Sequence, residues 1–155
     1  MDSQIFTTYN SEETRDLGKK IARWFTLRSE ATKGKVICLY GELGAGKTTF
    51  TQGLAGGLGI KKNITSPTFI LMREYQTRNP STRNPLTLYH LDCYRLEKPQ
   101  DTAGLGLKDL FNNPDNIICI EWAKKIKEFL PEKRTDIYFK NIGEDLREIK
   151  IIQIG

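Results

Sequence analysis

Eight consecutive residues of this chain have the types and spacing that bind phosphate. They read Gly41-Glu42-Leu43-Gly44-Ala45-Gly46-Lys47-Thr48 and match the P-loop pattern Gly-x4-Gly-Lys-Thr at every fixed position. Glycines let successive backbone N–H groups point inward and approach phosphate oxygens closely. We therefore expect Gly41, Gly44, Ala45 and Gly46 to form a nucleotide cradle. Lys47 should reach the β and γ phosphates of ATP, and the Thr48 hydroxyl should bind Mg²⁺.

The segments on either side of the cradle predict a strand that enters it and a helix that leaves it. Residues 36–40 are all apolar, which is typical of a buried strand of a parallel sheet. From Lys47 the apolar residues recur at helical spacing as far as the glycines at 56, 57 and 59. The helix would direct its positive dipole end at the phosphates. Thr49, in the first turn of this helix, either contacts the α phosphate or is an ordinary exposed residue. For residues 41–48 as a whole, the alternative is a glycine-rich turn that binds no nucleotide.

Two carboxylates stand at the ends of further predicted strands. Glu121 follows the apolar residues 117–120, and Asp92 follows the predicted strand 86–91. Mg²⁺ and the attacking water are held at such strand ends in nucleotide hydrolases. Alternation along a strand places His90 and Asp92 on the same face. A lone histidine here is more often structural than catalytic, whereas Asp92 and Glu121 are candidate ligands of Mg²⁺ or of water.

Ser66-Pro67-Thr68 precedes another predicted strand, at residues 69–75. Proline fixes the loop and places a hydroxyl on each side. The sequence leaves two interpretations open. One is a switch loop that senses the γ phosphate, and the other is an ordinary turn into a strand.

The remaining pattern completes an α/β fold. Asn10 and Glu13 have capping-box spacing before a helix at 11–28, and the polar, proline-containing residues 76–85 indicate an exposed loop. Further helices are expected around 105–111 and from 122 or 123 to 130, and a β-hairpin at 136–142 and 147–154. We expect a P-loop NTPase-like three-layer fold: a mainly parallel central sheet flanked by helices, with antiparallel strands that include the C-terminal hairpin, all in one domain of residues 1–155.

Composition limits the class of protein. Hydrophobic residues make up 38% of the 155 and charged residues 28%, which suits a folded globule and argues against disorder. The net charge of +5 is dispersed in pairs along the chain, and this does not establish nucleic-acid binding. The three cysteines lack paired spacing, so buried reduced thiols and a cytoplasmic location are expected. No apolar run is long enough to suggest a membrane partner.

Four motifs together resemble one family. Gly-Glu-Leu-Gly-Ala-Gly-Lys-Thr-Thr-Phe (41–50), Ser-Pro-Thr-Phe (66–69), His-Leu-Asp-Cys-Tyr-Arg-Leu (90–96) and Ile-Glu-Trp (120–122) are similar, in order and spacing, to the bacterial TsaE family. The resemblance implies a small ATPase that acts with the TsaB and TsaD proteins. Together they make threonylcarbamoyladenosine beside the anticodon of tRNA, and any contact of this chain with tRNA is expected to be indirect.

The resemblance also implies roles for individual residues. It makes Thr48 and Glu121 the ligands of Mg²⁺ and Asp92 a catalytic carboxylate that also lies close to the metal. It gives Ser66 to Thr68 a switch-like role and places Thr14 beside the adenine. Trp122 would shape the site or a partner surface, although a tryptophan at a helix start is ordinarily a packing residue.

The expected activity is slow, Mg-dependent hydrolysis of ATP that partner proteins accelerate. The sequence places no arginine clearly as an arginine finger, so a partner would supply or order the missing group. Two alternatives remain. A small-molecule kinase would use Arg78 and Arg83 in a lid, and a nucleotide-switched binding module would not need hydrolysis. No guanine-reading Asn-Lys-x-Asp motif occurs in the chain.

Overall fold

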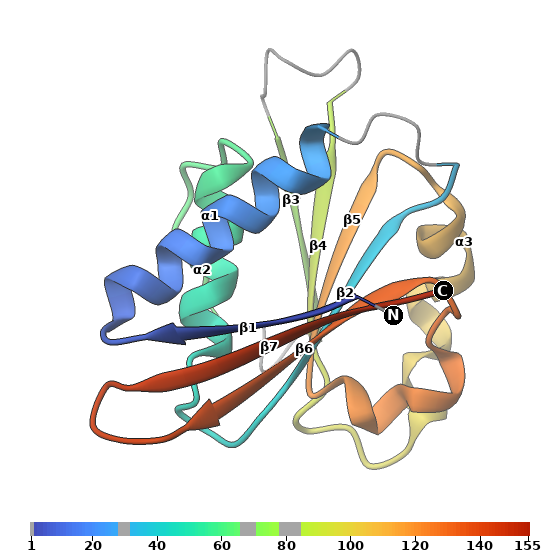
Figure 1. Ribbon diagram of the computed structural model, residues 1–155. Coiled ribbons are helices and arrows are strands. Elements are labelled where there is room, and N and C mark those ends of the chain that lie inside the picture. The colour runs from blue at the N-terminus through green and yellow to red at the C-terminus, as the bar shows by residue number, and fades with distance from the viewer. Residues whose placement is uncertain (1, 28–31, 66–70, 78–84) are drawn as a thin grey trace.

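A seven-stranded sheet organises the chain in a computed structural model that describes residues 2–27, 32–65, 71–77 and 85–155 (Figure 1). The elements in chain order are β1 (Ser3–Thr8), α1 (Ser11–Leu27), β2 (Lys35–Tyr40), α2 (Lys47–Gly57), β3 (Met72–Gln76), β4 (Thr87–Asp92), η1 (Pro99–Leu105), α3 (Leu107–Asn112), β5 (Asn116–Glu121), η2 (Ala123–Phe129), β6 (Arg134–Asn141) and β7 (Arg147–Ile154).

The strand order is β1-β7-β6-β2-β5-β4-β3, and the four central strands are parallel. The β6–β7 hairpin and the β3–β4 pair add antiparallel strands on the two sides. This arrangement confirms the predicted α/β class with a mainly parallel centre and a C-terminal hairpin. One strand was missed: β1 pairs antiparallel with β7, from Ser3 opposite Ile152 to Thr8 opposite Arg147. Only Thr8 of β1 is buried, so this edge strand lacks the apolar alternation that identifies a strand.

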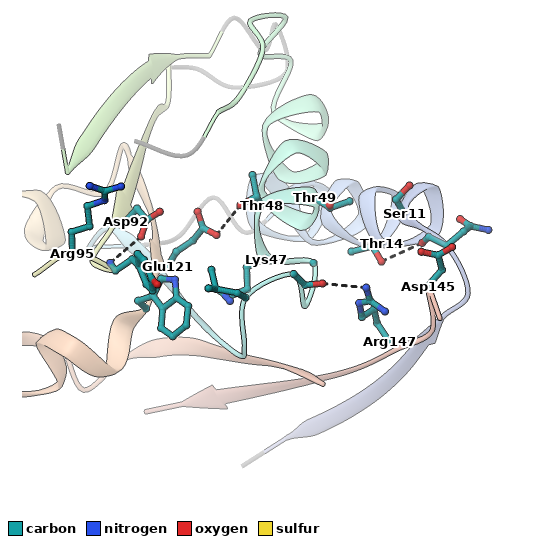
Figure 2. Close-up of a pocket in the computed structure, with 16 residues that line it drawn as sticks. Ser11, Thr14, Lys47, Thr48, Thr49, Asp92, Arg95, Glu121, Asp145 and Arg147 are labelled. Carbon is teal, nitrogen blue, oxygen red and sulfur yellow. Dashed lines mark hydrogen bonds between the residues drawn. The ribbon is translucent and has the colours of Figure 1, made fainter. Parts of the chain in front are cut away.

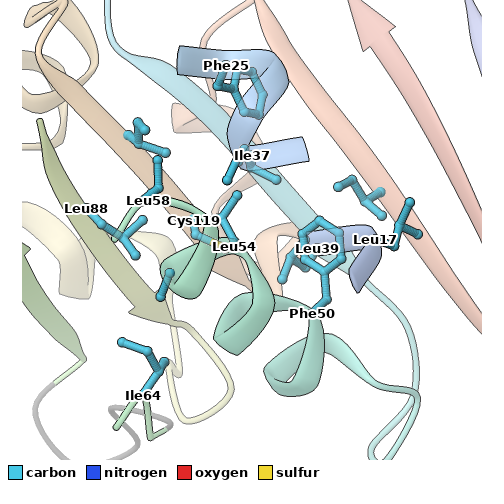
Figure 3. Packing of buried hydrophobic residues seen from close by; sticks show 14 of the residues in the cluster. Leu17, Phe25, Ile37, Leu39, Phe50, Leu54, Leu58, Ile64, Leu88 and Cys119 are labelled. Carbon is cyan, nitrogen blue, oxygen red and sulfur yellow. The ribbon is translucent and has the colours of Figure 1, made fainter. Parts of the chain in front are cut away.

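Helices cover both faces of the sheet, and strand alternation decides which face each side chain meets (Figure 1). On the face covered by α1 and α2, Ile37 and Leu39 of β2 pack with Leu88, Ile117 and Cys119 (Figure 3). On the other face, Val36, Cys38, Ile118 and Ile120 pack against the side of η1, α3 and η2. Residues of even number on β4 and of odd number on β5 therefore face α2.

The two helices on that face approach each other closely because glycines lie where they cross. A methyl group added at Gly53 would come within 2.0 Å of the Arg15 carbonyl oxygen, and one at Gly18 within 2.3 Å of the Phe50 carbonyl oxygen. Glycine costs about 1 kcal/mol in a helix relative to alanine, and the close approach of two backbones requires it here. The packing fixes α2, and hence the cradle at its start, against α1.

The start of α1 is capped much as the sequence predicts. The side-chain oxygen of Asn10 accepts a 2.8 Å hydrogen bond from the Glu13 N–H. The reciprocal bond is displaced by one residue, because the Glu13 carboxylate accepts from the Tyr9 N–H, also at 2.8 Å, and not from Asn10. The helix begins at Ser11 as expected, and the predicted last residue, Arg28, lies outside the described residues.

Two predicted helices differ from the structure. The expected helix from 122 or 123 to 130 is a 3₁₀ helix, η2, that is kinked at Ile126, and Trp122 before it is left-handed with φ 56°. The expected helix around 105–111 is divided, because Gly106 is left-handed (φ 64°) and separates the 3₁₀ segment η1 from α3. Apolar spacing indicated helical turns in both places and could not distinguish 3₁₀ from α geometry.

The cysteines are free and buried, as the sequence predicts. Burial raises the pKa of the Cys93 thiol and of the Cys119 thiol to about 12, and it raises the pKa of Cys38 further. The thiols are therefore protonated and inert at neutral pH. No helix in the described ranges is long and apolar enough to cross a bilayer.

The helix crossing yields a stability prediction. Gly53→Ala should lower the free energy of unfolding by about 1–3 kcal/mol, because the new methyl group meets backbone that cannot move aside. Gly56→Ala in the same helix is the matched control, since its methyl group would lie 3.8 Å from the flexible end of Lys19. The control should leave stability unchanged or raise it by up to about 1 kcal/mol. Urea denaturation measures both, and equal effects of the two substitutions would contradict this packing.

Candidate functional site

The loop between β2 and α2 has the backbone conformation of a phosphate cradle. Gly44 and Gly46 have φ of 74° and 102°, in the left-handed region that favours glycine. Gly46 is the residue before α2 and has no side chain, so no capping group occupies the N–H groups of the first helical turn. Free N–H groups and the positive dipole end at a helix start attract anions in proteins. Gly41 lies too close to the Phe139 carbonyl to carry a side chain, and the Ala45 methyl group is buried in the core.

A cavity of about 400 Å³ lies beside this loop (Figure 2). Lys47, Thr48, Asp92 and Glu121 line one end, and Figure 2 shows Ser11, Thr14, Asp145 and Arg147 at the other. Most of the residues singled out from sequence therefore lie together. The cavity joins the start of α1, the cradle, the ends of β4 and β5, and the β6–β7 hairpin.

Lys47 lies at the base of the cavity and is almost completely buried. Its Nζ atom donates hydrogen bonds of 2.6 Å and 2.8 Å to the carbonyl oxygens of Gly41 and Glu42, and it lies 4.5 Å from the centre of the Trp122 ring. Burial lowers the pKa of the Lys47 ammonium, and Glu121 and Asp92 oppose that change by stabilising the charged form. The cation thus lies between the cradle and two carboxylates.

Thr48 and Glu121 are in direct contact. The Thr48 hydroxyl donates a 3.0 Å hydrogen bond to Oε1 of Glu121, which joins the start of α2 to the end of β5. The other carboxylate oxygen, Oε2, lies 2.8 Å from Nε2 of His90, whose side chain is fully buried. Both oxygens of Glu121 are therefore held by protein groups.

Asp92 lies beside Glu121, in the paired position on the neighbouring parallel strand. Both side chains are nearly buried, with 6% and 3% of their surface exposed, and both line the cavity. One Asp92 oxygen accepts a 3.0 Å hydrogen bond from the Tyr94 N–H, which fixes the turn that follows β4. The expectation that His90 and Asp92 point the same way is confirmed, because both face α2.

These groups fit a magnesium ion. Mg²⁺ prefers hard oxygen ligands and is usually held by one or two carboxylates together with phosphates of the substrate. The Thr48 hydroxyl, Glu121 and Asp92 supply such oxygens next to the cradle. Within the described ranges there is no group of three or more His, Cys, Asp or Glu side chains that would form a metal cage of protein ligands alone. The donor set suits an ion that arrives with a nucleotide.

The remaining predicted residues lie at different places. Thr49 lines the cavity, and Thr14 lines it beside Gly46. The Thr14 hydroxyl is 2.8 Å from that of Thr8 and donates to the Asn10 carbonyl at 3.3 Å, so these bonds fix its position. Ser66 and Thr68 lie outside the described residues, as do Arg78 and Arg83.

Sequence reasoning missed several residues of the cavity, of which Arg147 is the best defined. Its Nη2 atom donates to the Gly44 carbonyl at 3.1 Å, and Nη1 donates to Asn141 Oδ1 and to the Leu146 carbonyl, each at 3.1 Å. Arg147 thus connects the hairpin to the cradle, and Arg95 also lines the cavity. The sequence placed no arginine clearly as an arginine finger, and it gave no indication that Arg147 lies beside the cradle. The residues around Arg147 in the sequence do not indicate its position. Arg147 reaches the cradle because β6 pairs with β2, which brings the β6–β7 hairpin beside the loop.

Trp122 has both of the roles considered for it. The side chain is partly buried against the core cluster on the η2 face, and it also lines the cavity. Its ring centre lies 5.0 Å from that of Tyr94, which is 41% exposed. The left-handed backbone at Trp122 turns the chain directly after Glu121.

Comparisons with known proteins identify the family of this chain. A family model described as "Threonylcarbamoyl adenosine biosynthesis protein TsaE" matches residues 8–149. A tRNA threonylcarbamoyladenosine biosynthesis protein TsaE of Bacillus subtilis is 41% identical over 148 residues, with 96% of this chain and 84% of the relative covered. The protein of the same name from Haemophilus influenzae is 38% identical, over 87% of this chain and 80% of its own length.

The fold comparison gives the same result. The crystal structure of Bacillus subtilis YdiB superposes with a TM-score of 0.76 at 37% identity, and the match covers 99% of this chain and 87% of that one. The family model and these relatives each extend over most of the chain, including the cradle, Asp92 and Glu121. This chain belongs to the TsaE family of threonylcarbamoyl adenosine biosynthesis proteins.

Proposed function

We propose that this chain binds ATP with Mg²⁺ and hydrolyses it slowly, as a partner-activated ATPase in the formation of threonylcarbamoyladenosine in tRNA. One observation carries the proposal. Lys47, Thr48, Asp92 and Glu121 converge on a single cavity at the cradle, although they come from three separate segments of the chain. The membership of the TsaE family supports the tRNA-modifying role.

Each residue has a task that follows from its position. The cradle amides and Lys47 would bind the phosphates, and Lys47 would stabilise the charge that develops on them during transfer. Its present bonds to the Gly41 and Glu42 carbonyls hold the ammonium within the loop. Thr48 and Glu121 would hold Mg²⁺, with Asp92 next to them, and the bound metal would neutralise phosphate charge.

The contacts of the two carboxylates support a different role for each. Glu121 is fixed by Thr48 on one oxygen and faces His90 on the other, which suits a metal ligand of defined orientation. Asp92 is the last residue of the neighbouring strand β4, and it borders the cavity at the turn where the Tyr94 N–H donates to it. We assign Asp92 to the attacking water, which it would orient in line with the γ phosphate.

The proposal assigns slow turnover to the isolated chain. Both terminal nitrogens of Arg147 donate to groups of this chain, so Arg147 is held at Gly44 rather than available as an arginine finger. We propose that TsaD and TsaB, the partners implied by the resemblance, supply or order the missing group, in the cytoplasm and without direct contact between this chain and tRNA. No observation on the described residues favours the kinase alternative.

Hydrolysis assays test the catalytic assignments. Asp92→Asn and Glu121→Gln should each lower the ATPase rate about 100-fold or more while ATP still binds, since they remove transition-state interactions. Lys47→Ala should weaken ATP binding itself. Asp109→Asn, an exposed carboxylate on α3, is the matched control and should match the parent. An Asp92→Asn variant that hydrolyses ATP at the parent rate would contradict the assignment of Asp92.

Adding TsaB and TsaD to the parent chain tests partner activation. The steady-state ATPase rate should rise at least tenfold, since groups supplied in trans contribute about 10³-fold or more in other phosphate-transfer enzymes. Hydrolysis that is equally fast in the isolated chain would contradict this part of the proposal.

Arg147 yields a separate prediction. Arg147→Ala should weaken nucleotide binding about three- to tenfold, the equivalent of one or two hydrogen bonds, because the cradle loses its bond at Gly44. Arg147→Lys should resemble the alanine variant, since lysine lacks the forked donors. Arg73→Ala, at an exposed residue of β3 that does not line the cavity, is the control. Titration with a fluorescent ADP analogue measures the affinities, and unchanged affinity in both Arg147 variants would refute a role in shaping the cradle.

A further inference from the structure

His90 is the single histidine of the chain and lies on β4, where its side chain is fully buried. Strand alternation directs it to the same face as Asp92, toward α2 and β5. On β5 its Nε2 atom lies 2.8 Å from Oε2 of Glu121. The residue is therefore adjacent to the proposed metal ligand and has no surface in the cavity.

The contact has a defined direction. An ionised carboxylate has only acceptors, so a hydrogen bond from His90 to ionised Glu121 requires the hydrogen on Nε2. The opposite oxygen of Glu121 accepts from the Thr48 hydroxyl at 3.0 Å. The end of a glutamate side chain rotates readily when nothing holds it, because its last torsion has broad minima. Here donors on two sides fix the plane of the carboxylate.

The second ring nitrogen of His90, Nδ1, indicates why a histidine is present at this position. Nδ1 of His90 is buried and has no hydrogen-bond partner in the part of the chain that the structure describes. A buried polar atom without a partner costs stability, and an apolar residue at this position would avoid that cost. Within that part of the chain, the one hydrogen bond of the His90 side chain that offsets this cost is the bond between Nε2 and Glu121.

We infer that His90 is a positioning residue for the metal site, whose Nε2–H orients the Glu121 carboxylate so that Oε1 and the Thr48 hydroxyl are presented together to Mg²⁺. The inference rests on the proposed function, because it concerns the same magnesium. Groups that orient a metal ligand from behind typically contribute about 10–100-fold to metal affinity. The effect of losing His90 should therefore appear in the magnesium requirement and not in the affinity for nucleotide alone.

Two amide substitutions of equal polarity separate positioning from packing. In His90→Gln the amide nitrogen can reach the place of Nε2, whereas in His90→Asn it reaches only the place of Nδ1. A fluorescent ADP analogue is bound to the full chain, and MgCl₂ is titrated. His90→Asn should raise the Mg²⁺ concentration at half-maximal response roughly tenfold, with affinity in EDTA within twofold of the parent, and His90→Gln should stay within about threefold on both measures. Equal behaviour of the two variants, or an unchanged magnesium requirement in His90→Asn, would overturn the inference.

A measurement on the unmodified chain covers the case in which the variants do not fold. Because there is one histidine, ¹⁵N signals of the imidazole belong to His90 without ambiguity. A hydrogen on Nε2, with signals that shift when Mg²⁺ joins bound ADP, supports the inference, and an imidazole protonated only on Nδ1 overturns it. The titration of the parent chain is evaluated first. If Mg²⁺ does not change nucleotide binding by the parent, the proposed function itself is contradicted. If the parent depends on Mg²⁺ but the His90 variants have the same magnesium requirement as the parent, only the role of His90 is contradicted.

Discussion

Two buried acids in paired positions on neighbouring parallel strands are the constraint around which the site is arranged. Asp92 and Glu121 lie side by side at the ends of β4 and β5 and face the same way. Carboxylates so placed repel each other, and burial weakens the solvent screening that would relieve the repulsion. Lys47 stabilises both, and Thr48 and His90 hold Glu121 through hydrogen bonds. A cation that binds together with phosphate would further reduce the repulsion between the two carboxylates.

The surrounding fold keeps that arrangement rigid. Parallel pairing of β2 with β5 and of β5 with β4 brings three strand ends to one edge, where the cradle begins. Glycines at the crossing of α1 and α2 bring the two helix backbones close together, so α2 presents Lys47 and Thr48 at a fixed place. The hairpin contributes from the other side, because β6 pairs with β2 and Arg147 reaches the Gly44 carbonyl. Elements from both ends of the sequence therefore support one loop.

The sequence predicted the parts of the site that local pattern encodes. The spacing of glycines and Lys47 pointed to a loop that does border the cavity, and alternation along β4 correctly gave the shared direction of His90 and Asp92. The apolar runs identified β2 and β5, two of the four parallel strands. Which strands are neighbours is a long-range property, so neither the pairing of Asp92 with Glu121 nor the approach of Arg147 to Gly44 was visible.

Other differences have local causes. The strand β1 is an exposed edge whose stability comes from hydrogen bonds to β7, and hydrogen bonding leaves no apolar signature. The segment after Trp122 has helical spacing of apolar residues, but it begins after a left-handed residue, is kinked at Ile126 and is a 3₁₀ helix. For His90 the sequence favours a structural role over a catalytic one, because the residues near it in the chain do not reveal its partner. Its contact with Glu121 appears only in three dimensions.

The most direct test of the central claim is the threonylcarbamoyladenosine content of tRNA in cells depleted of this protein and supplied with variants. The parent chain should restore the modification. Lys47→Ala, which should lose nucleotide, and Glu121→Gln, which should bind ATP without hydrolysing it, should both leave tRNA unmodified. Full modification supported by a Glu121→Gln chain shown to bind ATP without hydrolysing it would contradict the account, and nucleotide would then act only as a switch of shape.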